Sequence, residues 1–214
     1  MVEHRSDLAH AHSPGIPASA HAHAIGPYPT ATGLNTFKLG FWVFLGSETL
    51  FFGSLIATYM AYKNESVVGP YSHEILNIPL TSISTFVLLM SSLAMVLALD
   101  GVQRGMRTYA IASLLSVIVL GAGFLGFQAY EFTHFYHEGL KLQTNLFGSS
   151  FFILTGFHGA HVTIGVIWLL ILLIELLRGR MPPSRSLTLE IAGLYWHFVD
   201  IVWIIIFTLI YLIQ

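Results

Sequence analysis

The chain has 214 residues, of which 55% are hydrophobic and only 9% carry a formal charge. Because soluble domains are usually about 25% charged, this composition excludes a water-soluble globular protein and indicates an integral membrane protein. The net charge of -2 and the lack of a basic block give no sign of a nucleic-acid partner. The absence of cysteine excludes disulfides, thiolate metal sites and iron–sulfur clusters.

Residues 1–36 are predicted to form a polar N-terminal tail, rich in His, Ala, Pro and Ser. They lack the basic start and short apolar core of a signal peptide. Since imidazole titrates near neutral pH, the tail histidines are candidates for collecting protons at the membrane surface. The alternatives are loose metal chelation and a polar lead-in without such a role. The histidines concerned are His4, His10, His12, His21 and His23.

Residues 37–214 contain five apolar segments, each able to supply the roughly 20 residues that a hydrocarbon layer requires. The segments are 39–62, 80–99, 109–130, 147–174 and 191–213. They are continuous rather than alternating in polarity, which predicts helices and not barrel strands. The fold class expected is therefore all-α, with residues 37–214 forming one integral membrane bundle of five transmembrane helices.

The distribution of Lys and Arg predicts how the bundle is oriented. Seven of the nine basic residues lie in the N-terminal region or in the loops after the second and fourth spans, which share one side of the membrane. The other two, Lys63 and Lys141, lie in the opposite loops. Because basic loops stay in the cytoplasm, we expect a cytoplasmic N-terminus and a C-terminus outside.

Several ionisable side chains fall within the apolar spans, where each is costly and needs a reason. Glu48 follows Lys38 by ten residues, about 15 Å along a helix, and should lie near the membrane centre. Counting residues along the other spans in the same way places four further side chains at that depth, and places Glu131 closer to the external side of the membrane. The predicted buried polar residues are Glu48, Glu131, His158, His161, His197 and Asp200.

These residues allow two interpretations, a metal site and a polar core. His158 and His161 share one helix face, and Glu131 with His134 has the Glu-x-x-His spacing of di-iron bundles, which would make the chain a stand-alone membrane di-metal enzyme. However, such bundles need two Glu-x-x-His motifs and further glutamates, and Glu131 and His134 should lie about half a bilayer outward. We therefore expect no catalytic residue and no metal ligand.

Glu48 is the candidate functional carboxylate. On a Gly- and Phe-rich span it could relay protons, bind a lipid headgroup, or act in its protonated form as a hydrogen-bond donor. Five glycines of the third and fourth spans are expected to let helix backbones approach closely, namely Gly121, Gly123, Gly126, Gly156 and Gly159.

Four segments, in order, resemble subunit III of haem–copper oxidases. The first is similar to the glutamate-bearing helix of that family, and the third to its most recognisable segment. The segments are GFWVFLGSETLFF at 40–52, FLGFQAYEF at 124–132, GSSFF with TGFHGAHV between 148 and 162, and YWHFVDIVW at 195–203. Five helices with no counterpart of the first two mitochondrial helices are typical of the bacterial form.

The resemblance implies a non-catalytic subunit of a proton-pumping oxidase in the bacterial plasma membrane. Such an oxidase reduces oxygen to water with electrons from cytochrome c or quinol. Haem and copper would belong to partner subunits. This chain would pack beside subunit I, near a proton-uptake channel. It would also bind phospholipid and take part in a respiratory supercomplex. Glu48 matches the family's intramembrane glutamate, and the other five residues match its buried polar positions. An accessory subunit of a nitric oxide reductase system is the alternative.

Overall fold

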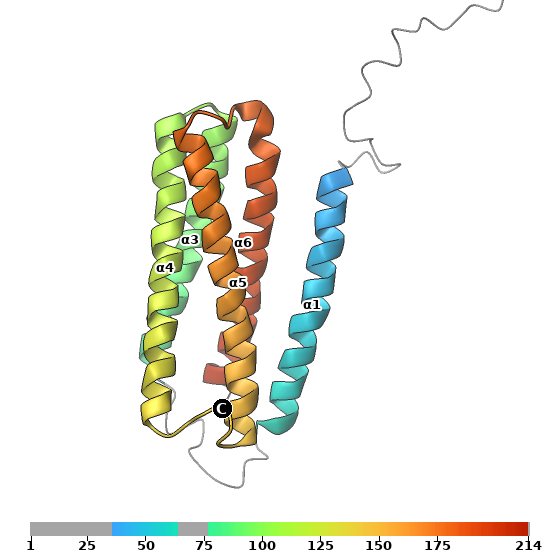
Figure 1. The fold of residues 1–214 in the computed structure, drawn as a ribbon, viewed down its shortest axis with the longest axis vertical. Helices are drawn as coiled ribbons and strands as arrows, with labels where there is room; N and C mark the ends of the chain where they lie inside the picture. Colours follow the sequence, from blue (N-terminus) through green and yellow to red (C-terminus); the bar gives the residue numbers. More distant parts are fainter. Residues whose placement is uncertain (1–35, 64–76, 214) are drawn as a thin grey trace, which may run out of the picture. The chain divides into compact units, whose positions relative to one another are not determined.

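The computed structural model describes residues 36–63 and 77–213, and the chain in these ranges is helical apart from short turns. It holds five helices long and apolar enough to cross a membrane, which confirms the predicted all-α class and its five spans. The five helices are α1 Thr36–Tyr62, α3 Ile78–Gln103, α4 Arg107–His137, α5 Leu146–Leu177 and α6 Ser186–Phe207 (Figure 1). A 3-10 turn, η2 Pro183–Arg185, precedes α6, and a π-helical turn, η3 Thr208–Leu212, follows it.

The chain divides into two compact units, Met1–Gly40 and Phe41–Gln214, and the contacts reported below lie within the second. Of the first unit, only the opening of α1 belongs to the described residues. The predicted tail of residues 1–36, with its five histidines, lies outside them except for Thr36. Its boundary and role stay predictions.

Local sequence signals fix where the bundle helices begin and end. The side chains of Asn77 and Asn145 cap α3 and α5, each accepting a hydrogen bond from the backbone N–H three residues later, at 3.1 and 2.7 Å. Past the other ends of these helices stand Gly105 and Gly179, both at φ 71°, a conformation that favours glycine. The caps stop each helix close to the edge of its apolar run.

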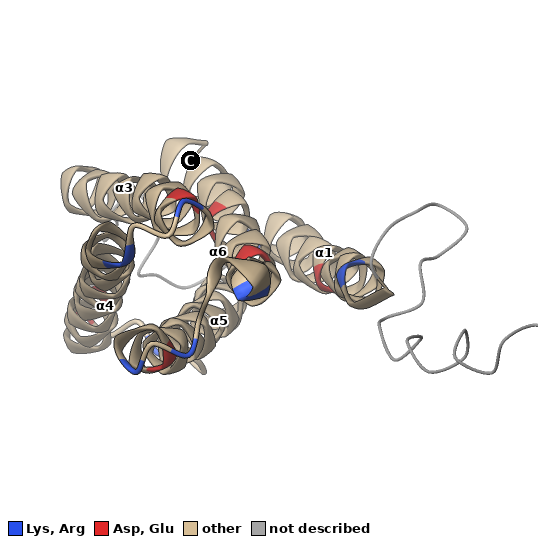
Figure 2. Ribbon diagram, turned by 90° about the horizontal axis from the view of Figure 1, so that it is seen from above, with Lys and Arg blue, Asp and Glu red and all other residues tan. Residues whose placement is uncertain are grey.

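Four helices form a ring in which α3 packs against α4 and α6, and α5 packs against the same two helices (Figure 2). Trp196 of α6 is fully buried inside the ring. Its indole N–H donates to the Ser91 hydroxyl of α3 at 2.9 Å. A Cβ placed on Gly121 of α4 or on Gly165 of α5 would come within 2.6 and 2.9 Å of the same indole. One side chain of α6 therefore contacts all three neighbouring helices.

The helix α1 packs on α5 and α6 along a narrow seam. Its buried residues, Leu45, Phe52 and Tyr59, are spaced seven apart and so lie on one helix face. The ring of Phe52 lies 4.9 Å from that of His161 on α5 and 6.3 Å from that of Phe198 on α6. The other faces of α1 are apolar and exposed, which suits contact with lipid or with another protein chain.

The arginines of the bundle gather at one end, where α3 joins α4 and α5 joins α6 (Figure 2). One of them, Arg107 at the start of α4, donates to two backbone carbonyls at the end of α5, at 3.3 and 2.6 Å. Lys63, which follows α1, instead donates to the carbonyl of Ile213 at the end where α6 finishes. The five arginines are Arg104, Arg107, Arg178, Arg180 and Arg185.

Candidate functional site

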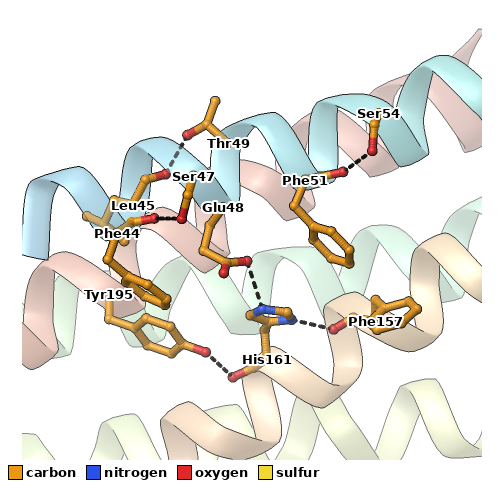
Figure 3. A network of polar contacts seen from close by, with 10 residues as sticks. All are labelled: Phe44, Leu45, Ser47, Glu48, Thr49, Phe51, Ser54, Phe157, His161 and Tyr195. Carbon is orange, nitrogen blue, oxygen red and sulfur yellow. Dashed lines mark hydrogen bonds and ion pairs between the residues drawn. The ribbon is translucent and has the colours of Figure 1, made fainter.

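Glu48 of α1 meets His161 of α5 (Figure 3). The Oε2 atom of Glu48 lies 3.2 Å from Nε2 of His161, and the two side chains are 19% and 16% exposed. The other ring nitrogen, Nδ1, lies 2.7 Å from the backbone carbonyl of Phe157, one turn earlier on α5. The pair thus joins two helices that are far apart in sequence.

These contacts define where protons can reside. Because a carbonyl oxygen only accepts hydrogen bonds, Nδ1 of His161 must carry a proton. A neutral imidazole then has a bare Nε2, so its contact with Glu48 needs a proton between the two atoms. That proton resides either on the carboxyl group or on an imidazolium. Both arrangements leave the pair neutral overall.

Aromatic rings and backbone groups fix the pair in place. Phe52 packs edge-on against the His161 ring, and Phe51 meets Phe157 at 5.2 Å. The Tyr195 hydroxyl of α6 donates to the backbone carbonyl of His161 at 3.1 Å. The hydroxyls of Ser47, Thr49 and Ser54 bind carbonyls of their own helix (Figure 3) and do not compete for the carboxylate.

His158 lies on the same helix as His161 but, unlike it, has no hydrogen-bond partner among the described residues. It is fully buried, and its ring stacks on that of Trp203 at 4.8 Å. Phe124 of α4 closes another side at 5.9 Å. In the described part of the chain, no side chain or backbone group bonds either ring nitrogen. The two histidines, predicted on one face, share the ring of Phe52 as a neighbour, but they have no common hydrogen-bond partner among the described residues.

The remaining predicted residues occupy two further places. His197 of α6 lies 2.7 Å, through Nδ1, from the hydroxyl of Ser92 on α3, and buried Asp200 lies close to the same serine. Glu131 of α4 accepts a hydrogen bond at 2.8 Å from the hydroxyl of Thr81, near the start of α3. The buried polar residues are thus divided among separate interhelical contacts.

No group of three or more His, Asp or Glu side chains that could hold a metal ion occurs among residues 36–63 and 77–213. The di-metal interpretation required Glu131 and His134 together with His158 and His161. Instead, Glu131 pairs with α3, and the ring of His134 stacks on Tyr130 at 6.4 Å. The structure gives this alternative no support.

Sequence reasoning missed the hydroxyls of α3, of which Thr81 and Ser92 contact ionisable residues and Thr85 and Ser91 accept hydrogen bonds from tryptophans. These hydroxyls recur at intervals of three, four and seven, the spacing of one helix face. A polar stripe on an otherwise apolar span was the signal that could have found them. The residues are Thr81, Ser84, Thr85, Ser91 and Ser92.

A family model described as cytochrome c oxidase subunit III matches residues 22–214. The chain belongs to the cytochrome c oxidase subunit III family. It is 43% identical to the quinol oxidase subunit 3 of Bacillus subtilis (strain 168) over 174 residues, 81% of this chain and 85% of that one. It is 42% identical to the cytochrome c oxidase subunit 3 of Bacillus sp. (strain PS3) over 183 residues, 86% and 88% of the two chains.

Membership in the subunit III family confirms the resemblance carried by the four segments. The chain is a subunit of a haem–copper terminal oxidase complex, which is an oxidoreductase. Its five spans and its bacterial relatives make it a multi-pass protein of the plasma membrane. The nitric oxide reductase alternative receives no support from these relatives.

Proposed function

We propose that this chain is a non-catalytic subunit III that packs beside subunit I and sustains proton uptake by the oxidase. Haem and copper reside in the partner subunits, and this chain contributes a proton-holding group within the membrane. The observation that carries the proposal is the Glu48–His161 pair, which holds one proton and stays neutral wherever that proton resides. A neutral pair is the form that a low-dielectric site tolerates best.

The N-terminus lies in the cytoplasm and the C-terminus outside. Support comes from the five arginines gathered at the end of the bundle where α3 joins α4 and α5 joins α6. Short loops rich in Lys and Arg remain on the cytoplasmic side of a membrane. Lys63 and Lys141 belong to the opposite, external side.

The electron donor, a quinol or cytochrome c, is selected by other subunits. Relatives named quinol oxidase subunit 3 and relatives named cytochrome c oxidase subunit 3 match this chain almost equally, at 43% and 42% identity. A donor site on this chain would make one of the two groups clearly more similar. The chain works in either setting, within a larger respiratory assembly and with phospholipid around it.

The proton-holding role is tested by replacing Glu48 in the whole oxidase complex. In Glu48→Gln, the amide N–H can donate to Nε2 of His161, so the haem content per copy of this chain should stay at the wild-type value. The amide holds no exchangeable acid proton, so the number of turnovers before activity decays should fall several-fold. Glu48→Leu leaves Nε2 without a partner, at a cost of about 1–3 kcal/mol, and should weaken assembly.

Glu175→Gln is the matched control, because Glu175 lies near the end of α5 and takes no part in the pair. It should leave both haem content and turnover unchanged. If Glu48→Gln loses the complex as Glu48→Leu does, the glutamate has a structural role. If Glu48→Gln assembles and turns over like the wild type, the proton-holding role is wrong.

A further inference from the structure

A second buried carboxyl group, that of Glu131, lies toward the end of the bundle away from the five arginines. It borders a cavity of about 620 Å³ between α3 and α4, together with Asn77 and His134. Glu131 is 7% exposed, and no ion pair links it to a Lys or Arg of the described helices. Its charge state therefore depends on the hydroxyl groups and the imidazole around it.

The number of protons available to three oxygen atoms distinguishes the two forms of Glu131. The hydroxyl oxygen of Thr81 lies 2.8 Å from Oε1 of Glu131 and 3.0 Å from the backbone carbonyl oxygen of Asn77. Thr81 brings one proton to these two contacts, and the carbonyl brings none. When Thr81 donates to an ionised Glu131, its contact with Asn77 lacks a proton. When Thr81 donates to Asn77, the second proton must come from the carboxyl group. Only the acid form supplies a proton to both contacts at once.

The groups around Glu131 also keep the ionised form within reach. Charge on a buried carboxyl group without a cation beside it is costly, which favours the acid. Against this, the hydroxyls of Thr81 and Tyr211 can donate to the carboxylate, and His134 lies one turn further along α4. Tyr211, on η3, in turn interacts with Tyr59 of α1. The site can therefore hold a proton and can also release it.

The cavity gives Glu131 a route to water. The helix α4 has 31 residues and is about 46 Å long, whereas a hydrocarbon core is about 30 Å thick. The excess length brings Glu131, six residues before the helix end, close to the edge of the hydrocarbon. His134 is exposed and lines the same cavity. An imidazole can accept a proton on one ring nitrogen and release a proton from the other, so His134 can pass protons between water and the carboxyl group.

We propose that Glu131 is a second proton-exchange site of this subunit, reached through the cavity from the side that the proposed orientation makes external. In its acid form, Glu131 donates to Thr81, and Thr81 donates to Asn77. When the carboxyl proton passes through His134 to water, Thr81 turns its own proton to Oε1. A proton returning from water restores the acid. The site is separate from the Glu48–His161 pair and does not depend on the role of that pair.

The protonation of Glu131 is tested by infrared spectroscopy of the whole oxidase complex at neutral pH, where protonated carboxyl groups absorb apart from carboxylates. In Glu131→Gln, the amide N–H can replace the acid O–H toward Thr81, so the complex should assemble and one protonated-carboxyl band should disappear. Glu138→Gln, at the same end of the bundle but outside the cavity, should leave that band in place.

The bond to Thr81 is tested in the same spectrum. Thr81→Val removes the acceptor and should shift the band, whereas Thr81→Ser keeps the hydroxyl and should leave the band where it is. If Glu131→Gln removes carboxylate absorption instead of this band, Glu131 is ionised and the proposal is overturned.

Transfer of the complex into deuterium oxide tests the route. The Glu131 band should shift to its deuterated position, and His134→Leu should slow this shift several-fold because the proton-passing ring is lost. His137→Leu, three residues further along and outside the cavity, is the matched control and should leave the rate unchanged. A band that does not shift, or equal slowing by the two leucine variants, would overturn the proposal. Glu48→Gln should leave the band and its rate unchanged, which separates this test from that of the Glu48–His161 pair.

Discussion

Trp196 shows how a single side chain can organise a membrane bundle. Its ring fits against Gly121 and Gly165, where any side chain would collide with it, and its N–H is bonded to Ser91. Trp203, two turns later on α6, repeats the arrangement, donating to Thr85 at 3.0 Å and packing on Phe124. In hydrocarbon, where helices gain little from apolar burial, such close packing and bonded N–H groups supply the association energy.

This packing makes Gly121→Ala a destabilising change. The added methyl group would lie 2.6 Å from the Trp196 ring, and overpacking of this kind costs about 1–3 kcal/mol. The free energy of unfolding in mixed detergent micelles should fall by that amount. Gly123→Ala, two residues away on the same helix, meets open space and should change it little. Equal losses in the two variants would show that Trp196 is not tightly enclosed.

The glycines of α4 and α5 show which packing contacts the sequence could not predict. Five of them were expected to allow close approach of helix backbones, but Gly121 and Gly159 instead make room for the side chains of Trp196 and Gln128. The expectation also fails for Gly123, Gly126 and Gly156, whose surroundings are open within the described structure. Residues two apart point to nearly opposite sides of a helix, and a sequence without contacts does not say which side is buried.

At the scale of elements, the five spans were predictable because the hydrocarbon thickness fixes the length of apolar sequence. The ends of the helices were not predictable, since the apolar sequence stops at the hydrocarbon edge whereas a helix can continue beyond it. The third span was predicted at 109–130, yet α4 runs Arg107–His137. Its last turns carry polar residues such as Thr133 and His134, which continue the helix into the headgroup layer. His134 of these extra turns lines a cavity between α3 and α4.

The N-terminal tail carries five histidines, whose imidazoles titrate near neutral pH. If its five histidines collect protons, deleting Met1 to Tyr28 should slow proton uptake by the oxidase at about pH 8, where free protons are scarce, more than at about pH 6. The rate is measured with a pH indicator in vesicles containing the complex. A full-length variant with the five histidines replaced by glutamine keeps the tail and removes only the imidazoles.

The tail deletion and the glutamine variant should slow proton uptake to the same extent. A deletion that slows uptake while the glutamine variant does not would indicate that the tail acts as a tether. An unchanged rate in both would remove the tail from proton chemistry.

At the scale of the whole molecule, the sequence predicted the depth of the polar residues but not their pairing. Counting along each helix places Glu48 and His161 near the same level. Their bond additionally requires the two side chains to point toward one another, which depends on how each helix is rotated. The same limit applies to Glu131 with Thr81 and to His197 with Ser92. Family resemblance supplied the function that helix counting alone left open.

The exposed surface of the second unit fits a subunit that works inside a larger complex. Apart from its narrow seam, α1 presents large apolar side chains outward, and Leu50 is 77% exposed. Lipid or a neighbouring subunit can cover such a surface in a membrane. Together with membership in the subunit III family, this surface indicates assembly with the other subunits of a haem–copper oxidase.

A visible spectrum and metal analysis of the chain, purified in mild detergent through a C-terminal tag, would test this assembly. We expect haem and copper to be present together with larger subunits, and to disappear when a harsher detergent strips the chain from its partners. The spectrum should then be colourless and the isolated chain free of metal. A chain that is purified without larger subunits, or that keeps stoichiometric metal after those subunits are removed, would show that it is not a metal-free subunit of an oxidase complex.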